Sequence, residues 1–107
     1  MVVPPPIMVD KLERIWLDGE LVRWDDAQVS VLTHTLHYGT GAFEGIRCYQ
    51  RATGESAIFR LREHIVRLFD SCKILQVTPT VSVEAVMQGC LDLVKANQVE
   101  SCYLRPL

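Results

Sequence analysis

Two stretches of the chain repeat their hydrophobic residues at the spacing of an amphipathic helix. Within residues 61–75 the apolar side chains recur at i, i+4, i+7, i+11 and i+14, which is one stripe of a helix. A second such stretch follows Pro79, with Ser82 or Thr80 available as its N-cap and Asn97 as its end. The pattern therefore predicts two helices, whose expected buried residues are Leu61, Ile65, Leu68, Cys72 and Leu75 in the first and Val83, Val86, Met87, Cys90, Leu91 and Val94 in the second.

Shorter apolar runs separated by turn residues predict β-strands. The dipeptide Asp18-Gly19 supplies the positive φ values that a type I′ hairpin turn requires. A second hairpin surrounds a turn that contains Gly54. Two hairpins, two helices and one final strand predict an α+β fold, a mainly antiparallel sheet with two helices packed on one face. The expected strands are 15–17, 20–24, 42–50, 56–60 and 101–105.

Composition and charge narrow the class of protein. The 107 residues carry a formal net charge of −2, and a nucleic-acid-binding protein would normally show a basic surplus. The chain is 49 % hydrophobic and 22 % charged, which is typical of a globular domain. Residues 1–10 contain three consecutive prolines and are expected to form a flexible N-terminal arm, and residues 11–107 one domain.

The four cysteines do not form a C-x-x-C pair, so a zinc ribbon and a thioredoxin-like redox site are excluded on spacing. In a secreted chain an even number could form two disulfides. Because Cys72 and Cys90 fall on the apolar faces of the predicted helices, we instead expect buried thiols. Reduced thiols and the absence of a signal-peptide pattern at the N-terminus predict a cytoplasmic protein.

A loop from His34 to Gly45 mixes histidines, hydroxyls and glycines, a composition found where backbone approaches a ligand. A glycine-bearing loop that only satisfies its own polar groups is the alternative. His34 and His37 could ligate a metal ion from one helical turn, but no carboxylate or cysteine completes the ligand set. We therefore predict no metal site.

Two other places could bind an anion. Arg67 could present its guanidinium to a phosphate, or form a surface ion pair with Glu63 four residues earlier. Tyr103 and Arg105, two apart on a strand, point to the same side and could together bind a carboxylate. The alternative for this pair is an amphipathic strand with a solvated arginine.

Four ordered sequence blocks resemble the branched-chain amino-acid aminotransferases, fold type IV enzymes that use pyridoxal 5′-phosphate. These blocks are IWLDGE at 15–20, HYGTGAFEGIRCY at 37–49, REHIVRL at 62–68 and YLRPL at 103–107. The resemblance implies that residues 11–107 are the N-terminal small domain of such an enzyme. The large C-terminal domain, its partner in the family, would then be absent from this chain.

The resemblance also assigns roles to residues at the cofactor and the substrate side chain. Arg67 matches the arginine that holds the cofactor phosphate. Phe43 and Gly45 match residues that line the pocket for the substrate side chain. Tyr38 matches a tyrosine that reaches into the active site of a neighbouring subunit, so a homo-oligomer, a dimer or larger, is implied.

Three further residues match positions that recognise substrate carboxylates. Arg105 would accept the side-chain carboxylate of glutamate or 2-oxoglutarate, and Tyr103 would help to bind the α-carboxylate. Arg47 matches a position near the same pocket. The implied activity is transfer of the amino group of L-leucine, L-isoleucine or L-valine to 2-oxoglutarate.

The Schiff-base lysine of the family lies downstream of the last matching block. None of Lys11, Lys73 and Lys95 matches it, so this chain supplies no catalytic residue and is expected to be inactive alone. The small domain of D-amino-acid aminotransferase or aminodeoxychorismate lyase is an alternative within the fold. A stand-alone binding or interaction module is an alternative from another class.

Overall fold

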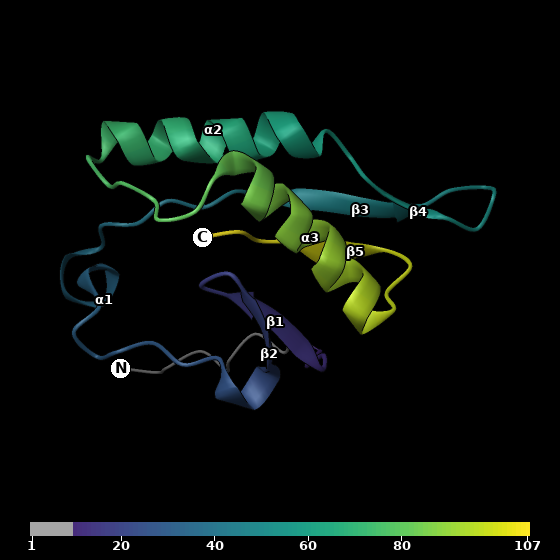
Figure 1. Ribbon diagram of the computed structural model, residues 1–107, viewed down its shortest axis with the longest axis horizontal. Helices are drawn as coiled ribbons and strands as arrows, with labels where there is room; N and C mark the ends of the chain where they lie inside the picture. Colours follow the sequence, from purple (N-terminus) through teal and green to yellow (C-terminus); the bar gives the residue numbers. More distant parts are fainter. Residues whose placement is uncertain (1–9) are drawn as a thin grey trace, which may run out of the picture.

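Two antiparallel sheets and two long helices make up the protein, in a computed structural model that describes residues 10–107 (Figure 1). The predicted α+β class is confirmed. The arm expected over residues 1–10 lies, apart from Asp10, outside the described residues. The elements in chain order are β1 (Arg14–Leu17), β2 (Glu20–Arg23), the 3-10 turn η1 (Trp24–Asp26), α1 (His34–Tyr38), β3 (Ile46–Gln50), β4 (Ser56–Ile58), α2 (Leu61–Ile74), α3 (Val83–Asn97) and β5 (Cys102–Leu104).

The main sheet has three strands in the order β4-β3-β5, and both pairings are antiparallel. Strands β1 and β2 form a separate hairpin, so the strands do not join in one sheet. Its turn has the predicted positive φ values, 52° at Asp18 and 93° at Gly19. The hairpin packs on α3 (Figure 1), and the ring of Trp16 lies against Gly89. Strands β1 and β2 form a separate sheet because they pack on α3 and do not pair with β3.

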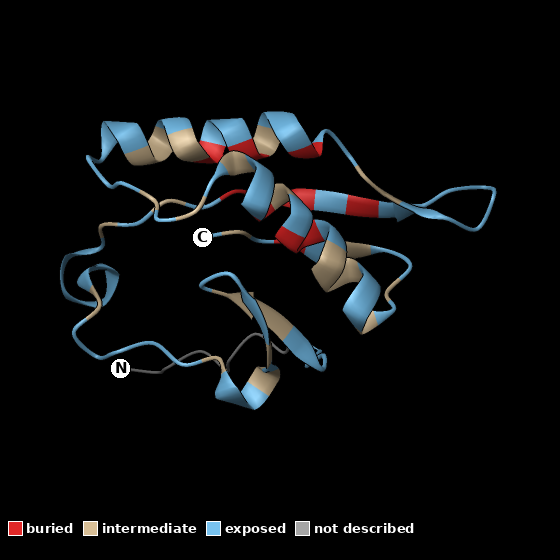
Figure 2. Ribbon diagram, in the orientation of Figure 1, coloured by how far each residue is buried: buried red, intermediate tan, exposed pale blue. Residues whose placement is uncertain are grey.

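The hydrophobic core lies between one face of the main sheet and the two helices. Along β3 the side chains alternate, so that Ile46 and Cys48 are buried while Arg47 and Tyr49 are exposed. Buried residues follow β3 and the inner sides of α2 and α3 in Figure 2. Both helices thus cover the same face, and the opposite face of the sheet is left open. The core cluster consists of Ile46, Leu61, Ile65, Val86, Cys90 and Leu104.

Helix α3 begins as the sequence predicts, because the Ser82 hydroxyl accepts a hydrogen bond from the amide of Ala85 at 3.1 Å. Two expected buried positions are wrong, since Leu75 and Leu91 are 40 % and 45 % exposed. Leu75 follows the last residue of α2. On α3 the buried side instead includes Gly89, which the helical pattern did not single out because it has no side chain.

Four of the predicted strands are shorter in the structure, since β2 ends at Arg23 rather than at residue 24, and β5 covers Cys102–Leu104 rather than residues 101–105. The other two are β3 and β4. The ladder of β3 starts at Ile46 rather than at residue 42, and β4 ends at Ile58 rather than at residue 60. Before Ile46 a single backbone bond continues toward β5, from the Glu44 amide to the Pro106 carbonyl at 3.0 Å. After β4 the backbone of Arg60 is left-handed, with φ of 51°, as the N-cap of α2.

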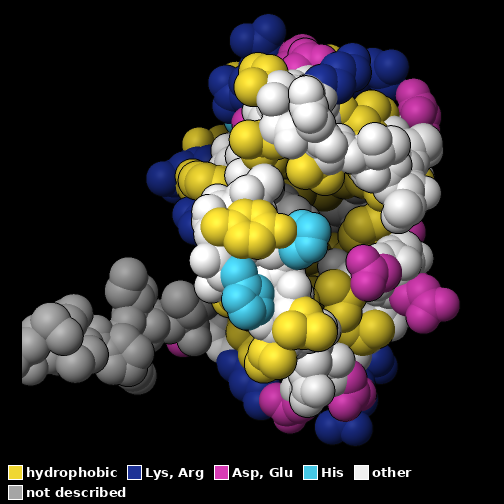
Figure 3. All heavy atoms as spheres, turned by 90° about the vertical axis from the view of Figure 1, so that its left-hand side faces the viewer, with side chains coloured by type: hydrophobic (Ala, Val, Ile, Leu, Met, Phe, Trp, Pro, Cys, Tyr) yellow, Lys and Arg dark blue, Asp and Glu magenta, His cyan; other side chains and the backbone are white. Residues whose placement is uncertain are grey.

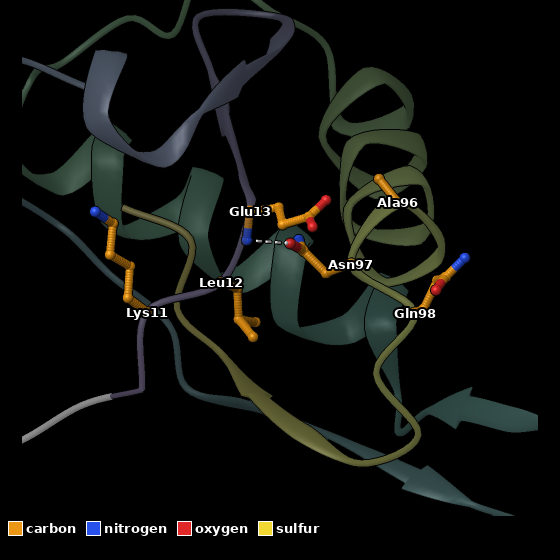
Figure 4. A pocket seen from close by; sticks show the side chains of 6 residues that line it. All are labelled: Lys11, Leu12, Glu13, Ala96, Asn97 and Gln98. Atoms are coloured by element: carbon orange, nitrogen blue, oxygen red, sulfur yellow. Dashed lines mark hydrogen bonds between the residues drawn. The ribbon is translucent and has the colours of Figure 1, made fainter.

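The side chain of Asn97 connects the β1–β2 hairpin to the end of α3 through hydrogen bonds. Its side-chain oxygen accepts hydrogen bonds from the amides of Glu13 and Arg14, at 3.1 and 2.9 Å. Its amide nitrogen donates to the carbonyls of Arg14 and Leu93, at 3.1 and 3.0 Å. The recess beside it, lined by Lys11–Glu13 and Ala96–Gln98, is shown in Figure 4. The side chain that the sequence pattern marked as a helix end therefore joins two elements.

We expect Asn97→Ala to lower the free energy of unfolding by about 1–3 kcal/mol, because four backbone groups lose a partner. Thermal or urea unfolding measures this change. Gln88→Ala is the matched control, since Gln88 lies on the same helix and bonds only Asp92, at 2.8 Å on the exposed side. Equal destabilisation by both substitutions would contradict the role given to Asn97.

All four cysteines lie in the described part of the chain and are free thiols, two of them buried. Burial raises the pKa of the Cys90 thiol to about 11. Burial is also the main reason why the pKa of Cys102 rises to about 11, with the neighbouring Cys48 adding to it. These thiols are consequently poor nucleophiles near neutral pH. Within residues 10–107, no helix combines the length and the apolar character needed to cross a bilayer.

Candidate functional site

The uncovered face of the main sheet carries aromatic and basic side chains. We call it the open sheet face and define it by residues that alternate with the buried ones on β3 and β5, together with residues directly beside the ends of β3, β4 and β5. Its four aromatic side chains are each more than half exposed. So much exposed apolar surface on one face is typical of a binding or interaction site. The open sheet face comprises Phe43, Gly45, Arg47, Tyr49, Phe59, Tyr103 and Arg105.

Two arginines of this face lie over aromatic rings. The guanidinium carbon of Arg47 is 5.3 Å from the ring centroid of Tyr103, its direct partner across β3 and β5. That of Arg105 is 5.0 Å from the ring centroid of Phe43. Stacking uses the flat face of a guanidinium and leaves its N–H edges free. Among residues 10–107 neither arginine has an acidic partner within 4.0 Å, so these edges can receive a carboxylate.

Gly45 lies directly under the side chain of Tyr103. A Cβ atom at Gly45 would overlap the Tyr103 hydroxyl and ring, so only glycine leaves room for this position of the phenol. The structure thus brings together five of the predicted site residues on one face: Phe43, Gly45, Arg47, Tyr103 and Arg105.

Arg67 lies on the helix side of the sheet, at Glu44. The Arg67 Nε donates to both carboxylate oxygens of Glu44 at 3.0 Å, and its Nη2 donates to Oε1 at 2.6 Å. The Glu44 side chain is only 7 % exposed, whereas that of Arg67 is 67 % exposed. The alternative ion pair of Arg67 with Glu63 is wrong, because Glu63 pairs with Arg60 at 3.5 Å.

Sequence reasoning missed Glu44, although a signal was present. Glu44 has the same parity as Ile46 and Cys48, so the period of two places it on the buried side of the strand. A carboxylate on that side requires partners. Its second partner is His64, whose Nδ1 lies 2.8 Å from Oε1. Because an ionised carboxylate only accepts hydrogen bonds, Nδ1 carries the proton.

The hydrogen bond from Arg67 is the main cause that lowers the pKa of Glu44 below its usual range. Burial opposes this effect, and the hydrogen bond from His64 adds to it. In turn, Glu44 raises the pKa of the Arg67 guanidinium. The pair is therefore ionised at neutral pH.

We expect Glu44 to make the protein more sensitive to acid. Since its pKa is lower in the folded state, its contribution to stability is present above the unfolded pKa of about 4.3 and is lost as the pH falls through the folded value. Urea unfolding of the wild type and of Glu44→Gln between pH 6 and pH 3 checks this. The free energy of unfolding should fall more steeply with decreasing pH in the wild type. Parallel curves would contradict it.

The structure does not bring Tyr38 to the open sheet face. Tyr38 is 63 % exposed on α1, and its ring lies 5.2 Å from that of His34. The Nε2 atom of His37 bonds the Val31 carbonyl at 2.6 Å, so this histidine holds the loop. Among residues 10–107 no three potential ligands gather around a metal position. Figure 3 views this side of the molecule, where apolar side chains gather beside histidines. The exposed apolar residues of this α1 segment are Val29, Val31, Leu32, Leu36 and Tyr38.

The sequence profile of the family described as "Amino-transferase class IV" matches residues 41–107, more than half of the chain. The chain belongs to the class IV aminotransferases. Among its relatives in this family is the branched-chain-amino-acid aminotransferase of Escherichia coli (strain K12), which is 48 % identical over 97 residues. That match covers 91 % of this chain and 31 % of the relative. The enzyme of the same name from Pseudomonas aeruginosa is 48 % identical over 100 residues, which is 94 % of this chain and 32 % of the relative.

Solved structures of branched-chain aminotransferases superimpose closely on this fold. The crystal structure of the Escherichia coli branched-chain enzyme has a TM-score of 0.84 at 46 % identity, over 89 % of this chain and 31 % of that one. The branched-chain enzyme from the thermophilic archaeon Thermoproteus uzoniensis, solved with norvaline, has a TM-score of 0.82 at 38 % identity, over 88 % and 32 %. This chain thus spans about a third of these relatives and corresponds to their N-terminal part.

Proposed function

We propose that residues 11–107 are the small domain of a branched-chain-amino-acid transaminase that uses pyridoxal 5′-phosphate. In this proposal the enzyme transfers the amino group of L-leucine, L-isoleucine or L-valine to 2-oxoglutarate. The observation that carries the proposal is the open sheet face, where an apolar wall adjoins two arginines without acidic partners among residues 10–107. The names of the similar enzymes support the branched-chain substrates.

A transaminase of this kind has to accept an apolar side chain and an acidic one in the same pocket. Phe43 supplies an apolar surface. Gly45 has no side chain, so the Tyr103 ring can lie close to the backbone at this position. Arg105 lies on Phe43 with its N–H edges free to bind the side-chain carboxylate of glutamate or 2-oxoglutarate. In the proposal Tyr103 donates to the α-carboxylate, and Arg47, stacked on Tyr103, adds positive charge beside it.

The residues present fit the phosphate of the cofactor. Glu44 occupies Nε and one side of Nη2 of Arg67, and the rest of this largely exposed guanidinium is open to an anion. Pyridoxal 5′-phosphate, when bound, supplies the electron sink for moving an amino group. Arg67 would hold its phosphate, while the open sheet face would orient the substrate.

The same proposal accounts for two exposed apolar surfaces. The large C-terminal domain of the enzyme would cover the open sheet face. A second copy of the enzyme would cover the α1 segment, so that Tyr38 reaches the neighbouring active site of a homodimer. The free thiols favour a cytoplasmic location.

A chimera tests this proposal. The 107 residues replace the corresponding N-terminal third of the Escherichia coli branched-chain enzyme, and transamination is assayed with several amino donors. We expect activity with L-leucine, L-valine and L-isoleucine and 2-oxoglutarate, and none from the 107-residue chain alone. A folded chimera that prefers D-alanine as amino donor would contradict the proposal in favour of a D-amino-acid aminotransferase. A folded chimera that forms an oxo acid without any amino acceptor would contradict it in favour of a lyase of the same fold.

A further inference from the structure

We propose that Glu44 is the positioning residue of Arg67, whose guanidinium it holds so that the outer edge faces a phosphate group. This inference rests on the proposed function, in which Arg67 binds the cofactor phosphate. It adds a residue that has no contact with the ligand. Its basis is the contact geometry of Glu44, Arg67 and His64.

The guanidinium of arginine has five N–H donors arranged on two usable edges. Glu44 occupies the edge formed by Nε and Nη2, with three donor–acceptor distances between 2.6 and 3.0 Å. The other edge, formed by Nη1 and the second N–H of Nη2, has no partner among residues 10–107. Because the guanidinium is planar and rigid, fixing the inner edge also fixes the direction of the outer one.

The carboxylate is itself held in place from two sides. His64 donates its Nδ1–H to Oε1, and His64 lies on the same helix as Arg67, three residues earlier. The backbone amide of Glu44 donates to the carbonyl of Pro106, two residues after the end of β5. The Glu44 side chain is 7 % exposed, so water does not compete strongly for it. Glu44 therefore provides a fixed reference point for a side chain that is otherwise 67 % exposed.

Two effects of Glu44 on phosphate affinity oppose each other. Its negative charge repels the phosphate dianion, which weakens binding. Its hydrogen bonds restrict the rotamers of Arg67 before the ligand arrives, which strengthens binding. If Glu44 positions Arg67, the second effect dominates. The positive guanidinium lies against the Glu44 carboxylate and offsets its charge, whereas the three hydrogen bonds fix the guanidinium directly. The sign of the change in Glu44→Gln separates the two effects.

The experiment uses the 107-residue chain at about 0.15 M salt and two probes, pyridoxine 5′-phosphate and pyridoxine, which differ only by the phosphate. Neither carries an aldehyde, so lysines do not react. Nitrogen-15 spectra report the Arg67 Nε–H signal, and the shifts of backbone amide signals on titration give the dissociation constant in the wild type and in every variant. We expect a slowly exchanging Nε–H in the wild type, rapid exchange in Glu44→Gln, and about tenfold weaker binding of the phosphate probe alone.

Two further variants keep the result interpretable. Glu44→Asp keeps the charge but shortens the reach, and we expect it to weaken binding as well. Glu63→Gln removes the same charge from a residue that contacts Arg60 instead, and we expect it to leave the Arg67 signal and the affinity unchanged. Thermal unfolding of each variant establishes that it is folded under the conditions used.

The outcomes distinguish a failure of the positioning role from a failure of the phosphate site. Unchanged or tighter binding in Glu44→Gln, while Arg67→Gln abolishes the phosphate preference, overturns the positioning role and leaves the function of Arg67 intact. If Arg67→Gln binds both probes as the wild type does, the phosphate site itself is wrong, and the positioning role is overturned with it.

Discussion

Gly89→Ala is expected to lower the free energy of unfolding by about 2–3 kcal/mol, which is roughly 10 °C in melting temperature for a domain of this size. An alanine Cβ at this position would lie 2.5 Å from Cε2 of Trp16, in the middle of the indole. Alanine favours a helix over glycine by about 1 kcal/mol. Here the overlap dominates, because both Gly89 and the ring are fixed between the hairpin and the core.

The cause can be isolated with a double-mutant cycle. Trp16→Leu removes the fused ring, so Gly89→Ala in that background should cost little or even stabilise the helix. Thermal and urea unfolding of the four proteins give the coupling energy. If Gly89→Ala costs as much in the Trp16→Leu background as in the wild type, the overlap with the indole is not the reason for the destabilisation.

Arg105→Gln, introduced in the chimera, is expected to reduce kcat/KM for glutamate and 2-oxoglutarate by about 10–100-fold and to affect L-leucine much less. Loss of a charge-assisted hydrogen bond of about 1.5–3 kcal/mol produces a change of this size. Steady-state kinetics with both amino donors measure it. Only a substrate with a side-chain carboxylate uses the free edge of this guanidinium, so the effect should be selective.

Arg51→Gln is the matched control for this selectivity. Arg51 directly follows β3, at the end of the strand opposite to Phe43 and Gly45, and carries the same charge. Its substitution should change the kinetics of neither substrate. An equal loss for glutamate and leucine in Arg105→Gln would mean that the residue supports the fold of the pocket and does not read the acidic side chain.

Much of the architecture could be predicted because local patterns determine it. The helix of residues 61–74 follows from one apolar stripe, and the first hairpin from Asp18-Gly19. Long-range packing could not be predicted in this way. The placement of the hairpin on α3 depends on Gly89, a residue whose contribution is the absence of a side chain, which no hydrophobic pattern records.

The candidate site likewise contains residues that local patterns predict and residues that only the three-dimensional structure reveals. Same-side placement of Tyr103 and Arg105 follows from the period of a strand, and the resemblance to a family supplied most of the other residues. The partner of Arg67 required three-dimensional information, because 23 positions separate it from Glu44. Local spacing instead suggested Glu63 as the partner of Arg67, but in the structure Glu63 pairs with Arg60.

The alternation of side chains at residues 43–45 has a consequence for how this domain can change its specificity. Phe43 and Gly45 face one side of the backbone, and Glu44 between them faces the other. Substitution of Phe43 can therefore reshape what is recognised on the open sheet face without disturbing the pairing of Glu44 with Arg67, whereas Gly45 has to remain a glycine beneath Tyr103. A shift of one residue in the pairing with β5 would exchange the two roles at once. Tolerance to substitution at Phe43 and intolerance to insertion or deletion should therefore coexist within these three residues.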